Sequence, residues 1–315
     1  MKRRVLMGVA GALAGVLVAV AGVLLTAKAP EAAPNKGTRA ERLRAERLPA
    51  GLDALKALAR PKGAPGPHDW LAQHDEPGQT LKEWQRGDPV KVTASLKALY
   101  VVRIGEVTPA QKRILELTRE FLALHFQVPV YELAPIEPSE IPKEATRLNP
   151  ISEELQFNSE WILENLLPPK RPKDGVALMA LTATDLWPGP GWNFVFGQAS
   201  TTQRVGVWSI ARHGDPETQG KLALLRTLKV AAHEAGHMFT LHHCIAFECL
   251  MNGGNHLGET DHGPLEPCPV CLAKQREATG AELHKRYAAL KEFFTREGLS
   301  DEAAFMEKSA AALSR

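Results

Sequence analysis

The pattern of hydrophobic and polar positions predicts strands and helices that alternate through the middle of the chain. Three short apolar runs are typical of strands: residues 96–104 (LKALYVVRI), 128–133 (VPVYEL) and 176–182 (VALMALT). Between the first two, apolar residues recur at helical spacing over residues 110–126, directly after Thr108 and Pro109. Threonine is a good helix N-cap, and proline suits the first helical position. This alternation predicts an α/β (α+β) domain with a mixed or parallel sheet and helices packed on it.

Three further stretches have helical character. Residues 158–167 and 219–229 show apolar positions three and four apart, and the second stretch continues into a histidine-containing sequence. Residues 273–313 are mostly helical in pattern, with a break expected near Gly298. The chain is long enough for one domain of roughly 220 residues with a sizeable core.

The amino terminus has the pattern of an export or anchoring segment. Three basic residues precede an uncharged run over residues 5–27, which as a helix would cross a bilayer core of about 30 Å. Ala27-Lys28-Ala29 resembles a cleavage site, but Pro30 and the length of the run favour an uncleaved anchor. We therefore predict a signal peptide or transmembrane anchor at 1–29, a Pro/Ala/Arg-rich linker at 30–66, and the main folded domain, with a C-terminal helical tail, at 67–315.

The net charge and the basic residues near the amino terminus indicate which kinds of partner the protein has. Lys and Arg total 38 against 36 for Asp and Glu, so the net charge of +2 gives no argument for nucleic acid. The short basic start resembles a secretory signal, which predicts a membrane-anchored or secreted protein with its domain outside the cytoplasm. Basic residues on both sides of the apolar run leave its orientation open. Leucines within residues 36–60 allow a short amphipathic helix. The oligomeric state stays open.

The sequence HEAGH, residues 233–237, predicts a zinc site. His233 and His237 are four residues apart on one predicted helix, so their imidazoles share a face and can bind one Zn²⁺. Glu234 would lie beside the open coordination position, where it can act as general base.

A tetrahedral site needs a third protein ligand, and the chain offers His242 and His243. A continuing helix would bring neither to the metal, so the chain must turn after Phe239 or Thr240. The spacing H-x3-H-x5-H that ends at His243 is that of the metzincins, which favours His243.

Four cysteines follow within a short stretch: Cys244, Cys249, Cys268 and Cys271. The last two form the knuckle CPVC, and together the four make a plausible closed structural zinc site. Two disulfides are the main alternative, above all in an oxidising compartment. Haem attachment is disfavoured because Leu272 stands where a histidine would follow, and redox activity because no strand leads into CPVC.

The segment HEAGHMFTLHHC, then Cys249, Met251 and CPVC, resembles the archaemetzincin signature HExxHxxGxxHC-x4-CxM-x17-CxxC. Residues 175–200, 204–214 and 68–84 resemble other parts of that family, so the similarity spans about residues 67–285. Two positions differ. Thr240 occupies the glycine position of the turn, where a positive φ is costly for a β-branched residue, so we expect a displaced turn that keeps His242 as a rival ligand. The last spacer is one residue shorter.

The resemblance implies a metzincin-like zincin domain: a twisted mixed sheet with an edge strand over the cleft, an active-site helix and C-terminal helices. It also implies two Zn²⁺ per chain, a catalytic one on His233, His237 and His243 and a structural one on the four cysteines, with Met251 in the Met-turn. Residues 205–211 would be the edge strand. His256, Asp261 and His262 are expected to be solvated.

The predicted function is hydrolysis of peptide bonds in a peptide or protein, by a zinc-activated water with Glu234 as base. Whether cleavage is internal or from an amino terminus stays open. The alternative is a non-catalytic, zinc-binding scaffold that binds peptides, which Thr240 would allow.

Overall fold

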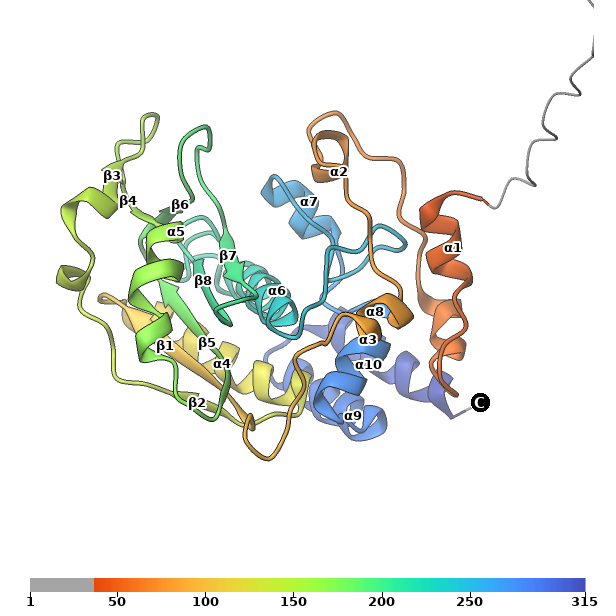
Figure 1. The fold of residues 1–315 in the computed structure, drawn as a ribbon. Coiled ribbons are helices and arrows are strands. Elements are labelled where there is room, and N and C mark those ends of the chain that lie inside the picture. The colour runs from red at the N-terminus through yellow and green to blue at the C-terminus, as the bar shows by residue number, and fades with distance from the viewer. Residues whose placement is uncertain (1–36, 315) are drawn as a thin grey trace, which may run out of the picture. The chain divides into compact units, whose positions relative to one another are not determined.

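A five-stranded mixed sheet organises the domain (Figure 1). Its strand order is β2 (Val130–Glu132), β1 (Ala98–Ile104), β5 (Gly175–Thr182), β8 (Val205–Ser209) and β7 (Gly197–Ser200). The first four strands are parallel, and β7 runs antiparallel to β8. The predicted mixed sheet is therefore confirmed. A smaller sheet of β3 (Thr146–Leu148), β4 (Leu155–Asn158) and β6 (Asp185–Trp187) lies beside it.

The edge strand is not the one predicted. Residues 205–209 form β8, which is buried at every position and lies between β5 and β7. The edge is β7, with the short, polar sequence GQAS and only partial burial. A strand that is paired on both sides and buried is rich in apolar residues, as β8 is. The edge strand β7 contains none of the β-branched or aromatic residues that identify strands in a sequence.

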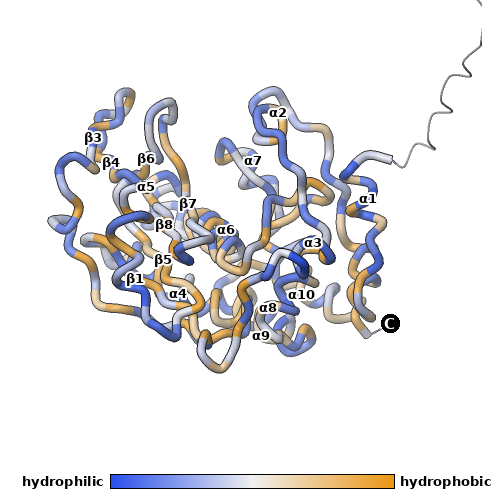
Figure 2. The backbone as a smooth tube through the Cα atoms, viewed as in Figure 1, coloured by the Kyte–Doolittle hydropathy of each residue, from blue (hydrophilic) through white to orange (hydrophobic). Residues whose placement is uncertain are grey.

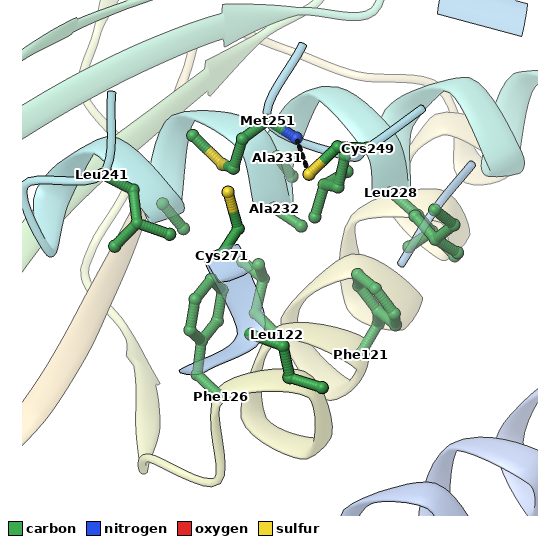
Figure 3. Packing of buried hydrophobic residues seen from close by; sticks show 14 of the residues in the cluster. Phe121, Leu122, Phe126, Leu228, Ala231, Ala232, Leu241, Cys249, Met251 and Cys271 are labelled. Atoms are coloured by element: carbon green, nitrogen blue, oxygen red, sulfur yellow. Dashed lines mark hydrogen bonds between the residues drawn. The ribbon is translucent and has the colours of Figure 1, made fainter. Parts of the chain in front are cut away.

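Both faces of the large sheet are covered. On one face, Met179 and Leu181 of β5 pack in the core that includes α4 (Pro109–Phe126) and α6 (Gly220–Met238). On the other face, Leu178 and Ala180 join a second cluster with the helical turn α5 (Ser159–Trp161) and the π-helical residues Ile162–Leu166 that follow it. This alternation is the period of a strand, and it holds α6 firmly against the sheet. Figure 3 shows aromatic residues of α4 packed against the small residues of α6.

The predicted helices are present. Thr108 caps α4 through its hydroxyl, and Pro109 is its first residue. The carboxyl-terminal part contains α8 (Pro269–Thr279), α9 (Leu283–Arg296) and α10 (Ser300–Leu313), with the expected break at Gly298. A second break, at Gly280, was not predicted; this glycine adopts φ 73° as the C-cap of α8.

The computed structural model describes residues 37–314, and the predicted export or anchoring segment at 1–29 lies outside them. Among the described residues, no helix is both long and apolar enough to span a bilayer. The amino-terminal helices are α1 (Arg39–Ala45), a 3-10 helix (Asp53–Leu58), α2 (Trp70–Gln73) and α3 (Leu81–Arg86).

The described part of the predicted linker belongs to the domain, which begins by Gly37 rather than at residue 67. Leu43, Leu48, Leu52 and Leu55 are all buried in the main core. Hydrophobic and hydrophilic positions alternate along this part of the chain (Figure 2). Burying these leucines stabilises the segment against the domain by about 1.5 kcal/mol or more for each side chain, which a solvated linker would forgo.

Candidate metal centres

The helix α6 carries the first two histidines of the predicted zinc site. His233 and His237 lie one turn apart, and their Nε2 atoms are 3.0 Å from each other. Their ring planes are nearly perpendicular, with centroids 4.7 Å apart. The two rings thus converge on one point outside the helix.

The turn that ends α6 is built at Thr240 itself. Its φ is 61°, so the residue adopts the left-handed conformation, and the expected displacement of the turn was wrong. The N–H of Thr240 donates to His237 O (2.9 Å), and the N–H of Leu241 donates to Gly236 O (3.3 Å). These two bonds form a Schellman motif, which satisfies the last carbonyls of the helix. They offset part of the strain of a β-branched residue there, roughly 1 to 3 kcal/mol.

Because the chain turns at Thr240, His243 reaches the other two histidines. Its ring centroid is 5.3 Å from that of His233 and 5.0 Å from that of His237. One nitrogen from each of the three side chains lies within 4.8 Å of the others. His242 is exposed and lies outside this group.

Hydrogen bonds orient all three imidazoles. The Nδ1 atoms contact Leu250 O (2.9 Å, from His233), Leu241 O (2.7 Å, from His237) and Glu76 Oε1 (2.6 Å, from His243). An Nδ1–H that donates to oxygen leaves Nε2 with a free lone pair, the form that binds a metal. Burial lowers the pKa of His233 to about 4, with the nearby His243 adding to the effect, and it lowers the pKa of His237 well below its usual value. Both rings are therefore neutral near pH 7.

Glu234 lies beside the histidines and is almost completely buried. Burial raises the pKa of its carboxyl to about 8. The edge strand β7 passes directly over it: a Cβ atom added to Gly197 would lie 2.7 Å from Glu234 Oε1 and 2.9 Å from its Cγ. Glycine at this position therefore lets the strand backbone approach the carboxylate.

The histidines and Glu234 line a cleft of about 520 Å³. One wall is β7 with the loop before it, including Trp192, and another contains Trp70 and Leu250. In Figure 1, α6 runs at the base between β7 on one side and α7 (Leu257–His262) with α2 on the other. An open cleft with a potential metal at its floor can admit an extended peptide.

Met251 is 1% exposed and packs against α6. A Cβ added to Gly236, the fourth residue of HEAGH, would lie 2.5 Å from Met251 Sδ. The helix and the methionine turn are therefore in direct contact, and the glycine makes that contact possible. The N–H of Met251 also donates to Cys249 Sγ at 3.4 Å, the dashed line in Figure 3.

The four cysteines form a separate, closed cluster. All are buried as free thiols, and their sulfurs lie within 4.8 Å of one another. Cys244 and Cys268 Sγ are 3.7 Å apart, and the N–H of Cys268 donates to Cys249 Sγ (3.1 Å). Four sulfurs around one point match the donor set of a tetrahedral zinc site.

A third group of possible ligands has a structural explanation. Its members, Asp69, His256 and Glu259, were not predicted as a group. His256 Nε2 contacts Asp69 Oδ1 at 3.1 Å, and its Nδ1 accepts the N–H of Glu259 at 3.2 Å. The Glu259 carboxylate accepts the N–H groups of Trp70 and Asn255, both at 3.0 Å. These bonds attach α7 to the segment around α2. The His256 side chain is partly exposed to solvent, as expected, and it also takes part in these bonds.

Asp261 and His262 are exposed, as expected, and the Asp261 side chain also has a structural partner. Its carboxylate pairs with the guanidinium of Arg226, with Nε donating to Oδ1 at 2.8 Å. This pair joins α6 to α7.

Three imidazoles and a buried carboxylate at the floor of an open cleft define the class of zinc metallopeptidases. Comparison with known proteins agrees. A sequence model of peptidase family M54 matches residues 172–277. Archaemetzincin-2 of Homo sapiens is 34% identical over 260 residues, and the match covers 71% of each chain. Archaemetzincin-2 of Mus musculus is 31% identical over 277 residues, covering 77% of this chain and 76% of the relative.

The chain belongs to the archaemetzincin family and is accordingly a zinc-dependent peptidase. Among solved structures, archaemetzincin from Methanopyrus kandleri shares 26% identity and has a TM-score of 0.48. That match covers 60% of this chain and 99% of the archaeal one.

Proposed function

We propose that His233, His237 and His243 hold the catalytic zinc of this peptidase and that Glu234 is its general base. The observation that carries this assignment is the orientation of the imidazoles: each Nδ1 is engaged by an oxygen, which leaves three Nε2 atoms for one ion. Three imidazole nitrogens with an open fourth position are the donor set of a catalytic zinc site.

A zinc ion held by these three histidines would act as a Lewis acid toward the scissile carbonyl and would lower the pKa of a water molecule bound to it. Glu234 lies at the same floor, and the positive charge of a bound zinc would favour its ionised form. Its carboxylate would then take a proton from the attacking water and deliver it to the leaving amine. The unpaired side of β7 offers backbone N–H and C=O groups to an extended peptide, which would lie along this edge. The contact between Gly197 and Glu234 keeps peptide, base and metal ligands close together.

The four cysteines hold a second zinc, which gives two per chain. Their buried, closed arrangement leaves no position for a substrate, so this ion stabilises the fold. It also supports the catalytic centre, since Cys244 directly follows His243 and Cys249 accepts a hydrogen bond from the N–H of Met251.

Residues 1–29 anchor the protein in a membrane or direct its export, with the catalytic domain outside the cytoplasm. The apolar run over residues 5–27 and the basic residues before it support this assignment. Membrane fractionation with and without residues 1–29 tests the anchor, and protease accessibility of intact cells tests the side on which the domain lies.

The catalytic assignment is tested by zinc content and by cleavage of a diverse peptide library. Glu234→Gln preserves the size of the side chain but removes the base, so we expect a loss of about 10²- to 10⁴-fold in kcat with both zinc ions retained. Glu154→Gln, an exposed residue outside the cleft, is the charge-matched control. A protein that holds two zinc ions but cleaves no peptide would instead be the non-catalytic scaffold.

A further inference from the structure

We propose that the segment Glu76-Pro77-Gly78-Gln79 positions the third zinc ligand, so that an amino-terminal part of the chain belongs to the catalytic centre. This inference rests on the proposed ligand role of His243. The segment lies in a strap, defined here as residues 66–80, which includes α2 and leads into α3. Glu76 and His243 are 167 positions apart in the sequence.

Glu76 is the orienting partner of His243. Its Oε1 lies 2.6 Å from His243 Nδ1 and 2.8 Å from the indole nitrogen of Trp70, which donates to it. The Trp70 ring also contacts the edge of the His243 ring, with centroids 5.1 Å apart. The other two histidines use backbone carbonyls, so His243 alone in the triad relies on a side chain. A carboxylate there fixes the ring and strengthens the imidazole as a ligand.

Gln79 secures the turn that delivers His243. Its side-chain N–H donates to Thr240 O (3.2 Å), and its Oε1 accepts the N–H of His242 (3.3 Å). The one amide therefore binds the backbone on both sides of Leu241, directly after the strained Thr240. In addition, the indole of Trp84 in α3 donates to Phe239 O at 2.9 Å. The residues that follow α6 are thus held from outside by the strap and by the helix after it.

Contacts with several other segments hold the strap in place. Gly78 adopts φ 61°, and a Cβ there would lie 2.8 Å from side-chain atoms of both Ile245 and Leu43. The Nζ of Lys274 donates to the Gln79 carbonyl and, at 3.2 Å, to its Oε1. Contacts with the residue two positions after His243 and with α8 hold Glu76 and Gln79 in register with the turn. This external support explains how threonine is accommodated at the left-handed position.

Metal affinity tests the role of Glu76 without any activity assay. In the full chain, Glu76→Ala should weaken metal binding at the histidine site by about 10- to 100-fold in chelator competition. The spectrum of Co²⁺ bound there should shift, while the thiolate-to-cobalt bands of the cysteine site stay unchanged. Asp75→Ala is the matched control, since it removes an exposed carboxylate next to Glu76 and should change neither quantity.

A double-mutant cycle separates positioning from general damage to the fold. In a His243→Ala background, Glu76→Ala should cause no further loss of metal affinity, because its partner is gone. Gln79→Ala should also weaken metal binding, and adding Thr240→Gly should restore part of that loss by relieving the strain at the turn. Independent losses in the first cycle, or no rescue in the second, would show a merely structural strap.

Two failures are distinguishable. If His243→Ala keeps wild-type affinity at the histidine site, the proposed ligand set is wrong. If His243→Ala loses metal but Glu76→Ala binds it as the wild type does, the ligand set stands and only the positioning role is overturned.

Discussion

The cysteine cluster begins at the residue directly after the last histidine of the histidine cluster, yet the two are built in different ways. The cysteines are buried free thiols from a single short stretch, between Cys244 and Cys271. The histidines face a cleft of about 520 Å³, and one of them depends on Glu76, far away in the sequence. All four sulfur donors of the closed cluster come from one short stretch of the chain. The open cluster also needs a residue from a distant segment to orient one of its histidines.

This difference fits the two tasks proposed for the clusters. A structural site gains stability by surrounding its ion with protein, so closely spaced ligands on short loops suffice. A catalytic site must leave a coordination position and a cleft open, so its ligands lack protein contacts on that side. Hydrogen bonds to the other nitrogen of each imidazole must then fix the ligands in place. Glu76, Leu241 and Leu250 supply that hold on the three imidazoles.

The largest effect is expected at the closed cluster. Cys271→Ser should release the second zinc and lower the free energy of unfolding by more than about 4 kcal/mol, the stabilisation from a ligand present at a thousand times its Kd. Zinc per chain and thermal unfolding measure this. His243→Ala is the companion variant: it should lose the other zinc with a smaller change in stability. A drop in stability on adding dithiothreitol but not on adding a chelator would point to disulfides instead.

A smaller effect is expected where the edge strand covers the base of the open site. Gly197→Ala adds a methyl that would overlap Glu234, so the carboxylate must move. We expect kcat to fall by up to about 100-fold with zinc content unchanged. Gly206→Ala on the neighbouring strand is the control, because its new Cβ would lie 3.7 Å or more from other atoms. Equal effects of the two variants would contradict a special role for Gly197.

The smallest effect concerns the turn between the two clusters. Thr240→Gly removes a β-branched side chain from a residue at φ 61°, and we expect it to raise the free energy of unfolding by about 1 kcal/mol. The midpoint temperature of thermal unfolding should rise by about 2 to 4 °C. Thr240→Ala keeps the strain and should bring little gain. A destabilised Thr240→Gly variant would mean that the threonine side chain contributes more than its strained backbone costs.

Much of the fold and the chemistry of the site could be predicted from the sequence. The pattern after Thr108 identified α4, and the central strands β1 and β5 were evident from their apolar runs. The pair His233 and His237 followed from helical spacing alone. These features depend on contacts within a few residues, so local periodicity encodes them.

Other features depended on long-range packing and were missed. The edge strand β7 has no strand signature, and its place follows from pairing with β8. The leucines before residue 67 looked like part of a linker because the core that buries them comes from distant segments. Glu76 and Gln79 carried one weak signal, an acidic residue before a Pro-Gly turn, and nothing in the sequence linked them to the histidines.

The sequence by itself determined the donors: three histidines and a glutamate at peptidase spacing, then four cysteines at spacing suited to zinc. Only the tertiary structure decided that His243 rather than His242 joins the first group, because this depended on the backbone conformation of Thr240. Local preference disfavours that conformation. Hydrogen bonds within the turn and from the strap support it, and their strength depends on the folded arrangement as a whole.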